Sequence, residues 1–404
     1  MALCVSLWMA GGSVALANGD VYINADDNTE HFDYPSEAYH DKVTHTGNSL
    51  TVTGDWSKAT LSSEYWFFYG GYSETPGKTV SGYTLTLDNA QVYGAYGGFS
   101  MDGGAVGNFL TLNMSEAEHD IHGGYAENGD ATGNTVTLKD DSRAKGDVFG
   151  GLSKNGDATG NTVTLTGSTV KANNDRSRTV YGGFVFDGAK DATGNTVSLT
   201  NSKVYGSVYG GYVDNDGDGS GDHVSGNTLN LSGENTVEAA LAGAPASPRG
   251  EVKNFETINI KSLNANVLTL TGKEEGSAGI KGNPTIKIAL DNPETYVPDN
   301  TATDLIVCTG NATIAAGVVF DPTQAYTVSP VSGVTIDAAL TGSYTLTDKK
   351  LTYTASNKAT KLTFTDVEWK DTGALFDHAA ALTNITFGNA AVDTSNINFT
   401  NIKR

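Results

Sequence analysis

A short phrase built on two glycines recurs six times in this chain. In each copy an aromatic residue or His precedes Gly-Gly, and an aromatic residue or Leu follows it; the first glycines are Gly70, Gly97, Gly123, Gly150, Gly182 and Gly210. Successive copies are therefore 27, 26, 27, 32 and 28 residues apart. A period of this length indicates a repeat architecture, which constrains the fold more than any local pattern does.

A second phrase, of the form Gly-Asn-Thr-Val-Thr-Leu, alternates with the first and occurs seven times. Its copies begin at Gly47, Gly82, Gly107, Gly133, Gly160, Gly194 and Gly226. Apolar residues stand two apart in each copy, as Val163 and Leu165 do on either side of Thr164. This alternation turns one row of side chains inward and the other toward water, so each copy is predicted to be a short strand.

One such unit cannot bury its apolar side alone, so neighbouring units must stack. We predict an all-β parallel β-helix, or β-solenoid, of about seven coils, rising roughly 34 Å at about 4.8 Å per coil. Val136, Val163 and Val197 would form one internal column, and the aromatic residues beside Gly-Gly would form two more. The Gly-Gly pairs are expected at sharp corners. A β-sandwich of hairpins is the alternative, because regular turns suit it too.

Composition limits the partners that the chain can have. Its 404 residues carry a formal net charge of -21, and only 18% of them are charged. Nucleic acids and anionic membranes are not expected as partners, because phosphate contacts require basic stripes.

The first residues are typical of a secretory signal peptide. An apolar run leads to Ala15-Leu16-Ala17, which has the form of a cleavage site, although the usual basic start is missing. A short apolar strand that caps the solenoid is the alternative. After cleavage Cys308 would be the single cysteine, so no internal disulfide is expected.

The domain organisation follows from where the phrases begin and end. We assign residues 1–17 to the signal peptide, 18–46 to an N-terminal cap, 47–238 to the repeat solenoid and 239–404 to a less regular β-rich region.

The repeated phrases, the segment 254–259 and the export signal together resemble the passenger domains of bacterial autotransporters, the type V secretion systems. The resemblance covers residues 18–270 well. It implies a right-handed parallel β-helix that passes through the periplasm and is displayed at the surface of a Gram-negative-type bacterium, or secreted. Such families carry a C-terminal translocator barrel, which is not evident after residue 270; membrane contact is therefore expected only through a translocator absent from this chain.

An acidic insertion at 214–222 breaks the repeat. Asp214, Asp216, Asp218 and Asp222 occupy the first, third, fifth and ninth positions of an EF-hand-like calcium loop, so they are candidate ligands for a weakly bound Ca²⁺. Ser225 replaces the Glu that completes such a site, and an acidic solvated loop is the alternative. No other cofactor is predicted.

Other acidic residues repeat with the coils. Asp130, Asp157 and Asp191 recur in the same turn and are therefore interpreted as turn residues rather than catalytic acids.

These features favour a non-catalytic scaffold or adhesin whose partner is a protein or glycan ligand on a host or neighbouring cell. Self-association is left open. The alternative is a β-helical polysaccharide lyase or hydrolase, for which only the acidic loop with nearby Arg176 or Arg178 offers suitable groups. A second insertion, 171–178, is either a partner surface or an ordinary variable loop.

Overall fold

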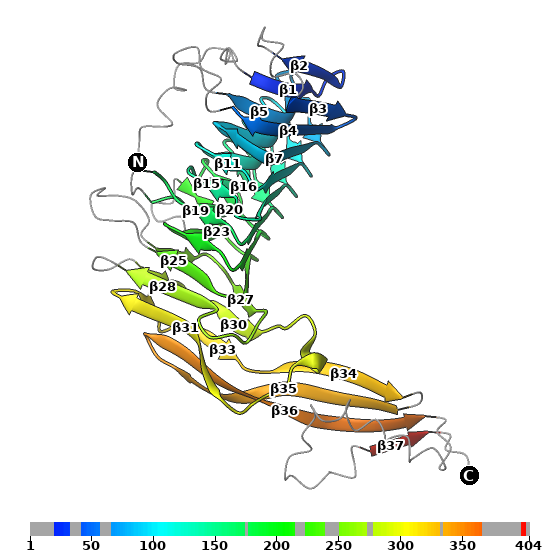
Figure 1. Cartoon of the computed structure of the whole chain (residues 1–404), viewed down its shortest axis with the longest axis vertical. Coiled ribbons are helices and arrows are strands. Elements are labelled where there is room, and N and C mark those ends of the chain that lie inside the picture. The colour runs from blue at the N-terminus through cyan, green and yellow to red at the C-terminus, as the bar shows by residue number, and fades with distance from the viewer. Residues whose placement is uncertain are drawn as a thin grey trace.

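The chain is an all-β protein with long sheets of parallel strands, an architecture compatible with a β-solenoid. The computed structural model describes residues 20–32, 42–56, 66–173, 177–214, 223–238, 250–272, 278–331, 334–365 and 397–400. Within these ranges no α-helix occurs, and one 3-10 turn, η3, spans Pro293–Thr295. Figure 1 shows the strands stacked along one axis, with a long hairpin projecting from the C-terminal end.

The Gly-Gly phrases form the strands of one sheet, here called sheet A. In stacking order its strands are β2 (Thr29–Phe32), β1 (Asp20–Asn24), β5 (Phe67–Ser73), β8 (Gly94–Ser100), β12 (Ile121–Ala126), β16 (Val148–Ser153), β20 (Val180–Val185), β23 (Val208–Val213), β26 (Glu251–Lys253), β29 (Gly279–Ile280) and β32 (Thr313–Ile314). All neighbours in this order pair in parallel except β2 and β1, which are antiparallel.

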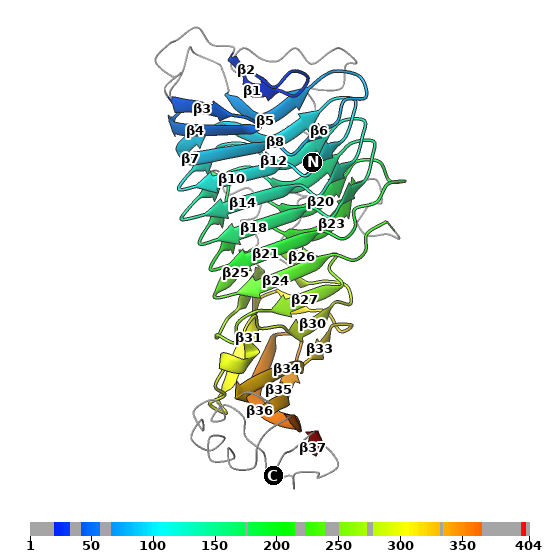
Figure 2. The ribbon, with the colours of Figure 1, turned by 90° about the vertical axis from the view of Figure 1, so that its right-hand side faces the viewer.

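The Thr-Val-Thr-Leu phrases form a second parallel stack, which Figure 2 shows with strand beneath strand. Its strands are β4 (Ser49–Asp55), β7 (Thr84–Val92), β10 (Phe109–Asn113), β14 (Thr135–Lys139), β18 (Thr162–Thr166), β21 (Thr196–Thr200), β24 (Thr228–Ser232), β27 (Thr257–Ile260), β30 (Thr285–Ile288) and β33 (Val319–Asp321). Val136 pairs with Val163, and Val163 pairs with Val197. All three side chains are buried in the central core, so the predicted internal column is confirmed.

Short strands complete each turn of the chain. One row lies beyond the Thr-Val-Thr-Leu stack and consists of β11 (Glu116–Ala117), β15 (Arg143–Ala144), β19 (Thr169–Val170), β22 (Lys203–Val204), β25 (Asn235–Glu238), β28 (Leu268–Gly272) and β31 (Ala302–Gly310). The other row follows the Gly-Gly strands and consists of β6 (Val80–Ser81), β9 (Ala105–Val106), β13 (Ala131–Thr132) and β17 (Ala158–Thr159). The first row contributes Ala117, Ala144 and Val170 to the central core, whereas the buried alanines of β9, β13 and β17 form small separate clusters.

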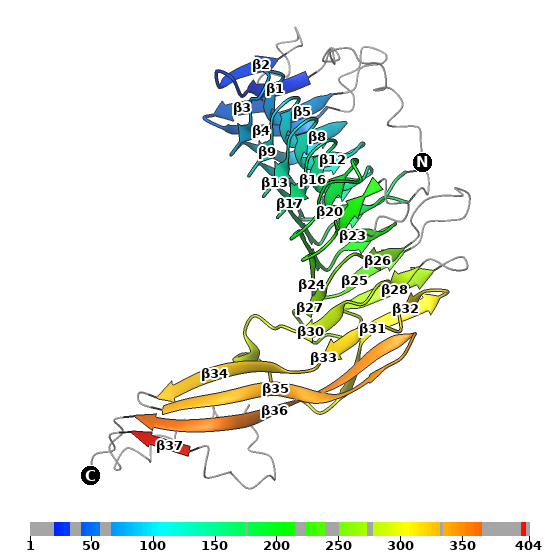
Figure 3. The ribbon, with the colours of Figure 1, turned by 180° about the vertical axis from the view of Figure 1, so that it is seen from behind.

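Antiparallel strands lie at both ends of the stack. At the N-terminal end β2 pairs with β1, and β3 (Val43–Thr46) pairs with β4. At the other end, which Figure 3 shows from behind, β34 (Gln324–Val331), β35 (Val334–Leu346) and β36 (Lys350–Thr365) pair in order, and β37 (Ile397–Thr400) pairs in parallel with β36. Parallel pairing thus continues past residue 238, where the repeated phrases end, through β33.

The predicted corners at the Gly-Gly pairs are wrong, because the pairs lie inside the strands of sheet A. Gly150 and Gly151 stand in the middle of β16. A Cβ atom on Gly150 would lie 2.4 Å from the carbonyl oxygen of Gly182 on the next strand, and one on Gly151 would lie 2.4 Å from the Asn161 side chain. The glycines are therefore required by close backbone and side-chain approach, not by a bend.

The asparagines of the second phrase form a buried ladder. They are Asn108, Asn134, Asn161, Asn195 and Asn227, each with no exposed area. In each of the four steps the side-chain Nδ2 donates to Oδ1 of the next asparagine at 3.1 Å. The backbone N–H donates to the same Oδ1 at 2.8 to 3.0 Å. This ladder ties each coil to the next through polar groups that are sheltered from water.

Candidate functional site

The predicted calcium loop lies at the end of β23. Asp214 directly follows that strand, and burial raises the pKa of its carboxyl group above the ordinary value. Asp216, Asp218 and Asp222 fall outside the described residues. In the ranges that the structure describes, no group of three or more His, Cys, Asp or Glu side chains could hold a metal ion. The calcium site therefore stays a prediction.

The repeated aspartates act as turn residues, as the sequence indicated. Asp130 Oδ1 accepts a hydrogen bond from the backbone N–H of Asp157 at 2.9 Å, and Asp157 Oδ1 accepts one from Asp191 at 3.0 Å. His223, which belongs to the following coil, has its Nδ1 atom 2.8 Å from Asp191 Oδ1. The carboxylates thus hold successive turns in register.

The rings beside Gly-Gly form two columns, as the sequence predicted, but the columns run along the outer face of sheet A and not inside the coils. The first column contains Tyr69, Tyr96, His122, Phe149, Tyr181 and Tyr209, whose neighbouring rings stack with centroids 4.6 to 5.6 Å apart. The second contains Tyr72, Phe99 and Tyr125, then Leu152, then Phe184 and Tyr212. Both columns pack separately from the central core.

The ring faces in these columns are occupied by one another. Phe149, for example, stacks on His122 with centroids 4.7 Å apart and on Tyr181 with centroids 5.0 Å apart, and it is only 7% exposed. Phe184 stands at right angles to Phe149, with centroids 5.6 Å apart. Such contacts stabilise the coil stack, but they leave little ring surface on which a sugar could lie.

The imidazole within the first column is held neutral. Burial, and next the charge of His119, lower the pKa of His122 to about 3. Its ring lies between Tyr96 and Phe149, with interplanar angles of 5° and 3°. His122 therefore serves as an uncharged stacking partner and not as a proton carrier near neutral pH.

A pair of carboxylates lies beside the aromatic columns. Asp120 Oδ1 accepts a hydrogen bond from the Asp147 N–H at 2.7 Å, and Asp147 Oδ1 accepts one from the Thr179 N–H at 2.8 Å. Burial, and next the charge of Asp120, raise the pKa of Asp147 to about 7, against the opposing effects of the Thr179 N–H and Arg178. Asp147 therefore exchanges its proton near neutral pH.

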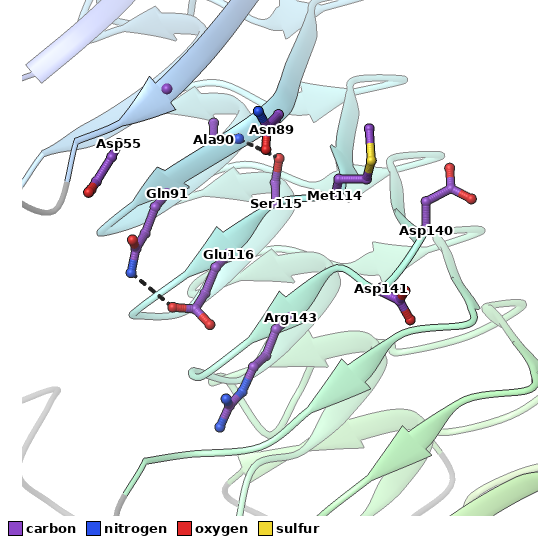
Figure 4. A pocket seen from close by; sticks show the side chains of 11 residues that line it. Asp55, Asn89, Ala90, Gln91, Met114, Ser115, Glu116, Asp140, Asp141 and Arg143 are labelled. Atoms are coloured by element: carbon purple, nitrogen blue, oxygen red, sulfur yellow. Dashed lines mark hydrogen bonds between the residues drawn. The ribbon is translucent and has the colours of Figure 1, made fainter.

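An open groove of about 520 Å³ runs across the bend between the Thr-Val-Thr-Leu strands and the short strands. Four carboxylates line it, from Asp55, Glu116, Asp140 and Asp141, together with the guanidinium of Arg143. Figure 4 shows the side chains of Glu116 and Arg143 projecting from successive strands on the same face. The groove offers acceptors along most of its length and a cation at one end, an arrangement suited to polar ligands.

The second insertion begins and ends against one tyrosine. Lys171 Nζ lies 4.4 Å from the centroid of the Tyr205 ring, and the Arg178 N–H donates to the Tyr205 carbonyl oxygen at 2.9 Å. Asn173 Nδ2 donates to Glu118 Oε2 at 3.3 Å, although 55 residues separate them. Residues 174–176, including Arg176, lie outside the described ranges.

The sequence interpretation missed the charged face on which this insertion lies. Outward positions of the short strands hold Arg143 and Lys203, in register with Thr169 between them. Part of the signal was present, because Arg143 and Lys203 each stand seven residues before the first glycine of a Gly-Gly pair, whereas the second insertion moves Thr169 to thirteen residues before its pair. A charged residue seen in one coil alone does not show that charged residues of other coils lie on the same face.

Comparisons with known proteins add no relative for this chain. Of the residues that the structure describes, none belong to a helix long and apolar enough to cross a membrane. No family model, curated protein or solved structure matches the chain.

Proposed function

We propose that this protein is an exported, non-catalytic surface protein that acts as a scaffold or adhesin, in the manner of an autotransporter passenger. In this proposal the parallel stack is a right-handed β-helix whose seven phrase-bearing coils hold the variable loops away from the cell.

The observation that carries the proposal is the repetition of the same inter-coil contacts along the axis. From Asn108 to Asn227 every step of the buried ladder uses the same two hydrogen bonds. Stacked rings reinforce the same steps on the outside of sheet A. Because both the asparagine ladder and the stacked rings join each coil to the next, we expect a stiff, protease-resistant rod. A surface scaffold requires these mechanical properties.

Surface display can be tested with the native reading frame expressed in a Gram-negative host, carrying an epitope tag in the turn between Asp187 and Lys190. We expect antibody labelling of intact cells and loss of the label after external protease treatment. Retention of all tagged protein inside intact cells would contradict export.

Adhesion and catalysis are tested with purified protein. Beads coated with the protein should adhere to at least one host or bacterial cell type more than beads coated with albumin. The same preparation should release no reducing ends or unsaturated sugars from pectin, alginate or host glycans. Sustained turnover on any of these substrates would replace the scaffold proposal with the polysaccharide lyase or hydrolase.

A further inference from the structure

A row of cations crosses the short-strand face of this acidic chain. Arg143, Thr169 and Lys203 occupy equivalent outward positions on β15, β19 and β22. Lys171 and Arg178 lie beside them, at the two ends of the second insertion. We call Arg143, Lys171, Arg178 and Lys203 the basic stripe. Its four charges stand together in a protein whose net charge is -21.

Arg143, Lys171 and Lys203 form no ion pair within the described part of the chain, whereas the charge of Arg178 acts on the Asp147 carboxyl group. Nearby Glu116 and Glu118 form ion pairs with Lys145, so their charges are balanced by a cation outside the stripe. No described carboxylate lies within 4.0 Å of a side-chain nitrogen of the four stripe residues. The Nε atoms of Arg143 and Arg178 are also buried without a hydrogen-bond partner. Because these two atoms have almost no accessible surface, an anionic ligand from solution must bond to the other side-chain nitrogens of the stripe.

The geometry of the stripe suits a narrow, extended ligand. Adjacent strands are about 4.8 Å apart, roughly the length of one pyranose residue. Tyr205 presents a ring next to Lys171, and Thr169 and Thr236 place hydroxyl groups in the same outward column as Arg143 and Lys203. Cations and hydroxyl groups alternate along this column and a single ring lies beside it, so these groups can contact successive sugars along one chain.

We propose that the basic stripe binds a linear polysaccharide that carries carboxylate or sulfate groups. The proposal rests on the adhesive function proposed above and names its ligand class. A broad polyanion such as duplex DNA or an anionic bilayer would also meet the acidic groove beside the stripe, where Asp140, Asp141 and Glu116 would repel it. Arg143 itself lines that groove, so a single glycan chain that follows the stripe meets the groove only at its Arg143 end.

The test measures binding of the purified full chain to immobilised polysaccharides. Heparin probes sulfate groups, polygalacturonate probes carboxylates alone, and dextran is the neutral reference. The variant Arg143→Gln, Lys171→Gln, Lys203→Gln removes three stripe charges. The control variant Lys281→Gln, Lys287→Gln, Lys358→Gln removes three charges elsewhere and gives the same net charge. Far-UV circular dichroism checks that both fold.

We expect the wild type and the control variant to bind heparin or polygalacturonate, more weakly as salt rises. The stripe variant should lose about tenfold or more in affinity, because three charge contacts are removed. Binding to heparin alone identifies sulfate as the recognised group, whereas binding to polygalacturonate shows that carboxylate suffices. Wild-type binding to neither polysaccharide, equal losses in the two variants, or equally tight binding to duplex DNA or anionic vesicles would each overturn the proposal.

Bead adhesion separates this proposal from the proposed function. If beads coated with wild type and with the stripe variant adhere to cells equally well, the adhesin proposal stands and the stripe is not its ligand site. If the stripe variant loses polysaccharide binding while wild-type beads adhere to no cell type, the stripe assignment stands and the adhesive function is wrong.

Discussion

Asn134 and Asn161 are 27 residues apart in the chain, yet the side-chain Nδ2 of Asn134 donates to Oδ1 of Asn161 at 3.1 Å. The backbone N–H of Asn134 donates to the same oxygen at 2.9 Å. One amide oxygen thus joins two coils through two hydrogen bonds in a site with no exposed area.

Asn161→Ala should destabilise the fold by about 3 kcal/mol, because it leaves two donors of Asn134 buried and unpaired. Urea denaturation followed by circular dichroism measures the free energy of unfolding. Asn155→Ala is the matched control, since Asn155 is exposed and its loss should cost less than about 1 kcal/mol. Equal losses in the two variants would show that the ladder does not stabilise the stack.

Gly150→Ala should cost about 3 kcal/mol or more, because the added Cβ meets a backbone carbonyl oxygen that cannot move aside. Gly133→Ala is the comparison. Gly133 has a φ of +64° and open space around a Cβ, so the expected cost there is about 1 to 2 kcal/mol. The ranking of the two variants in urea denaturation tests whether close approach, rather than backbone conformation, requires the glycine pair.

Phe149→Ala should cost about 3 kcal/mol, since the ring stacks on both neighbours and is almost fully buried. Phe149→Leu should cost about 1 kcal/mol, because Leu152 already fills the equivalent place in the second column on the same strand. Melting temperatures give the order of the three proteins. Unchanged stability in Phe149→Ala, together with lost cell adhesion, would instead assign the columns to ligand binding.

The pH dependence of stability should carry the signature of Asp147. Its pKa is about 7 in the folded protein and about 4 when unfolded, so the folded state binds the proton more tightly. The contribution of Asp147 to the free energy of unfolding is therefore largest below pH 4. It falls as the pH rises from 4 to 7 and does not change above pH 7. Asp147→Asn should raise the melting temperature at pH 8 and leave it unchanged at pH 4.

Asp157→Asn is the control for this prediction, because Asp157 accepts an equivalent backbone hydrogen bond from an exposed turn. At pH 8 it should not raise the melting temperature as Asp147→Asn does, because it relieves no buried carboxyl group. If Asp147→Asn changed the melting temperature by the same amount at every pH, its effect would not come from the charge of the carboxyl group.

Calcium should bind the acidic loop weakly. Isothermal titration with Ca²⁺ is expected to give a dissociation constant of about 0.1 to 1 mM, the range of sites with incomplete ligand sets. Asp218→Asn should reduce the heat, whereas Asp187→Asn, on another loop, should not. If no heat appears up to several millimolar Ca²⁺, the loop is an acidic solvated segment.

Much of the stack could be predicted from the period of the chain. Because equivalent residues of a stacked repeat lie above one another, Val136, Val163 and Val197 could be placed in one core column. The rings beside Gly-Gly could be placed in two columns, although not on the outer face where they lie. These predictions needed only the spacing and the alternation of apolar residues.

The glycine pairs could not be placed in the same way. Gly151 is glycine because the Asn161 side chain, ten residues later, fills the space where a Cβ would stand. Glycine and asparagine are both common in turns, so each position on its own favoured a turn. The contact between them becomes visible only when the two sides of one coil are brought together. The basic stripe was missed for a related reason, since Arg143 and Lys203 share a column, with Thr169 between them, only when the coils are stacked.

The asparagine ladder has a consequence for how such a gene can change. Asn134 and Asn161 present the same donors and acceptors to both sides, and each follows a glycine in the same phrase. Deleting residues 134–160 would join Gly133 to Asn161 and recreate the junction that was lost. Recombination can therefore lengthen or shorten the stack by whole coils, through duplication or excision, without creating a new kind of interface between coils.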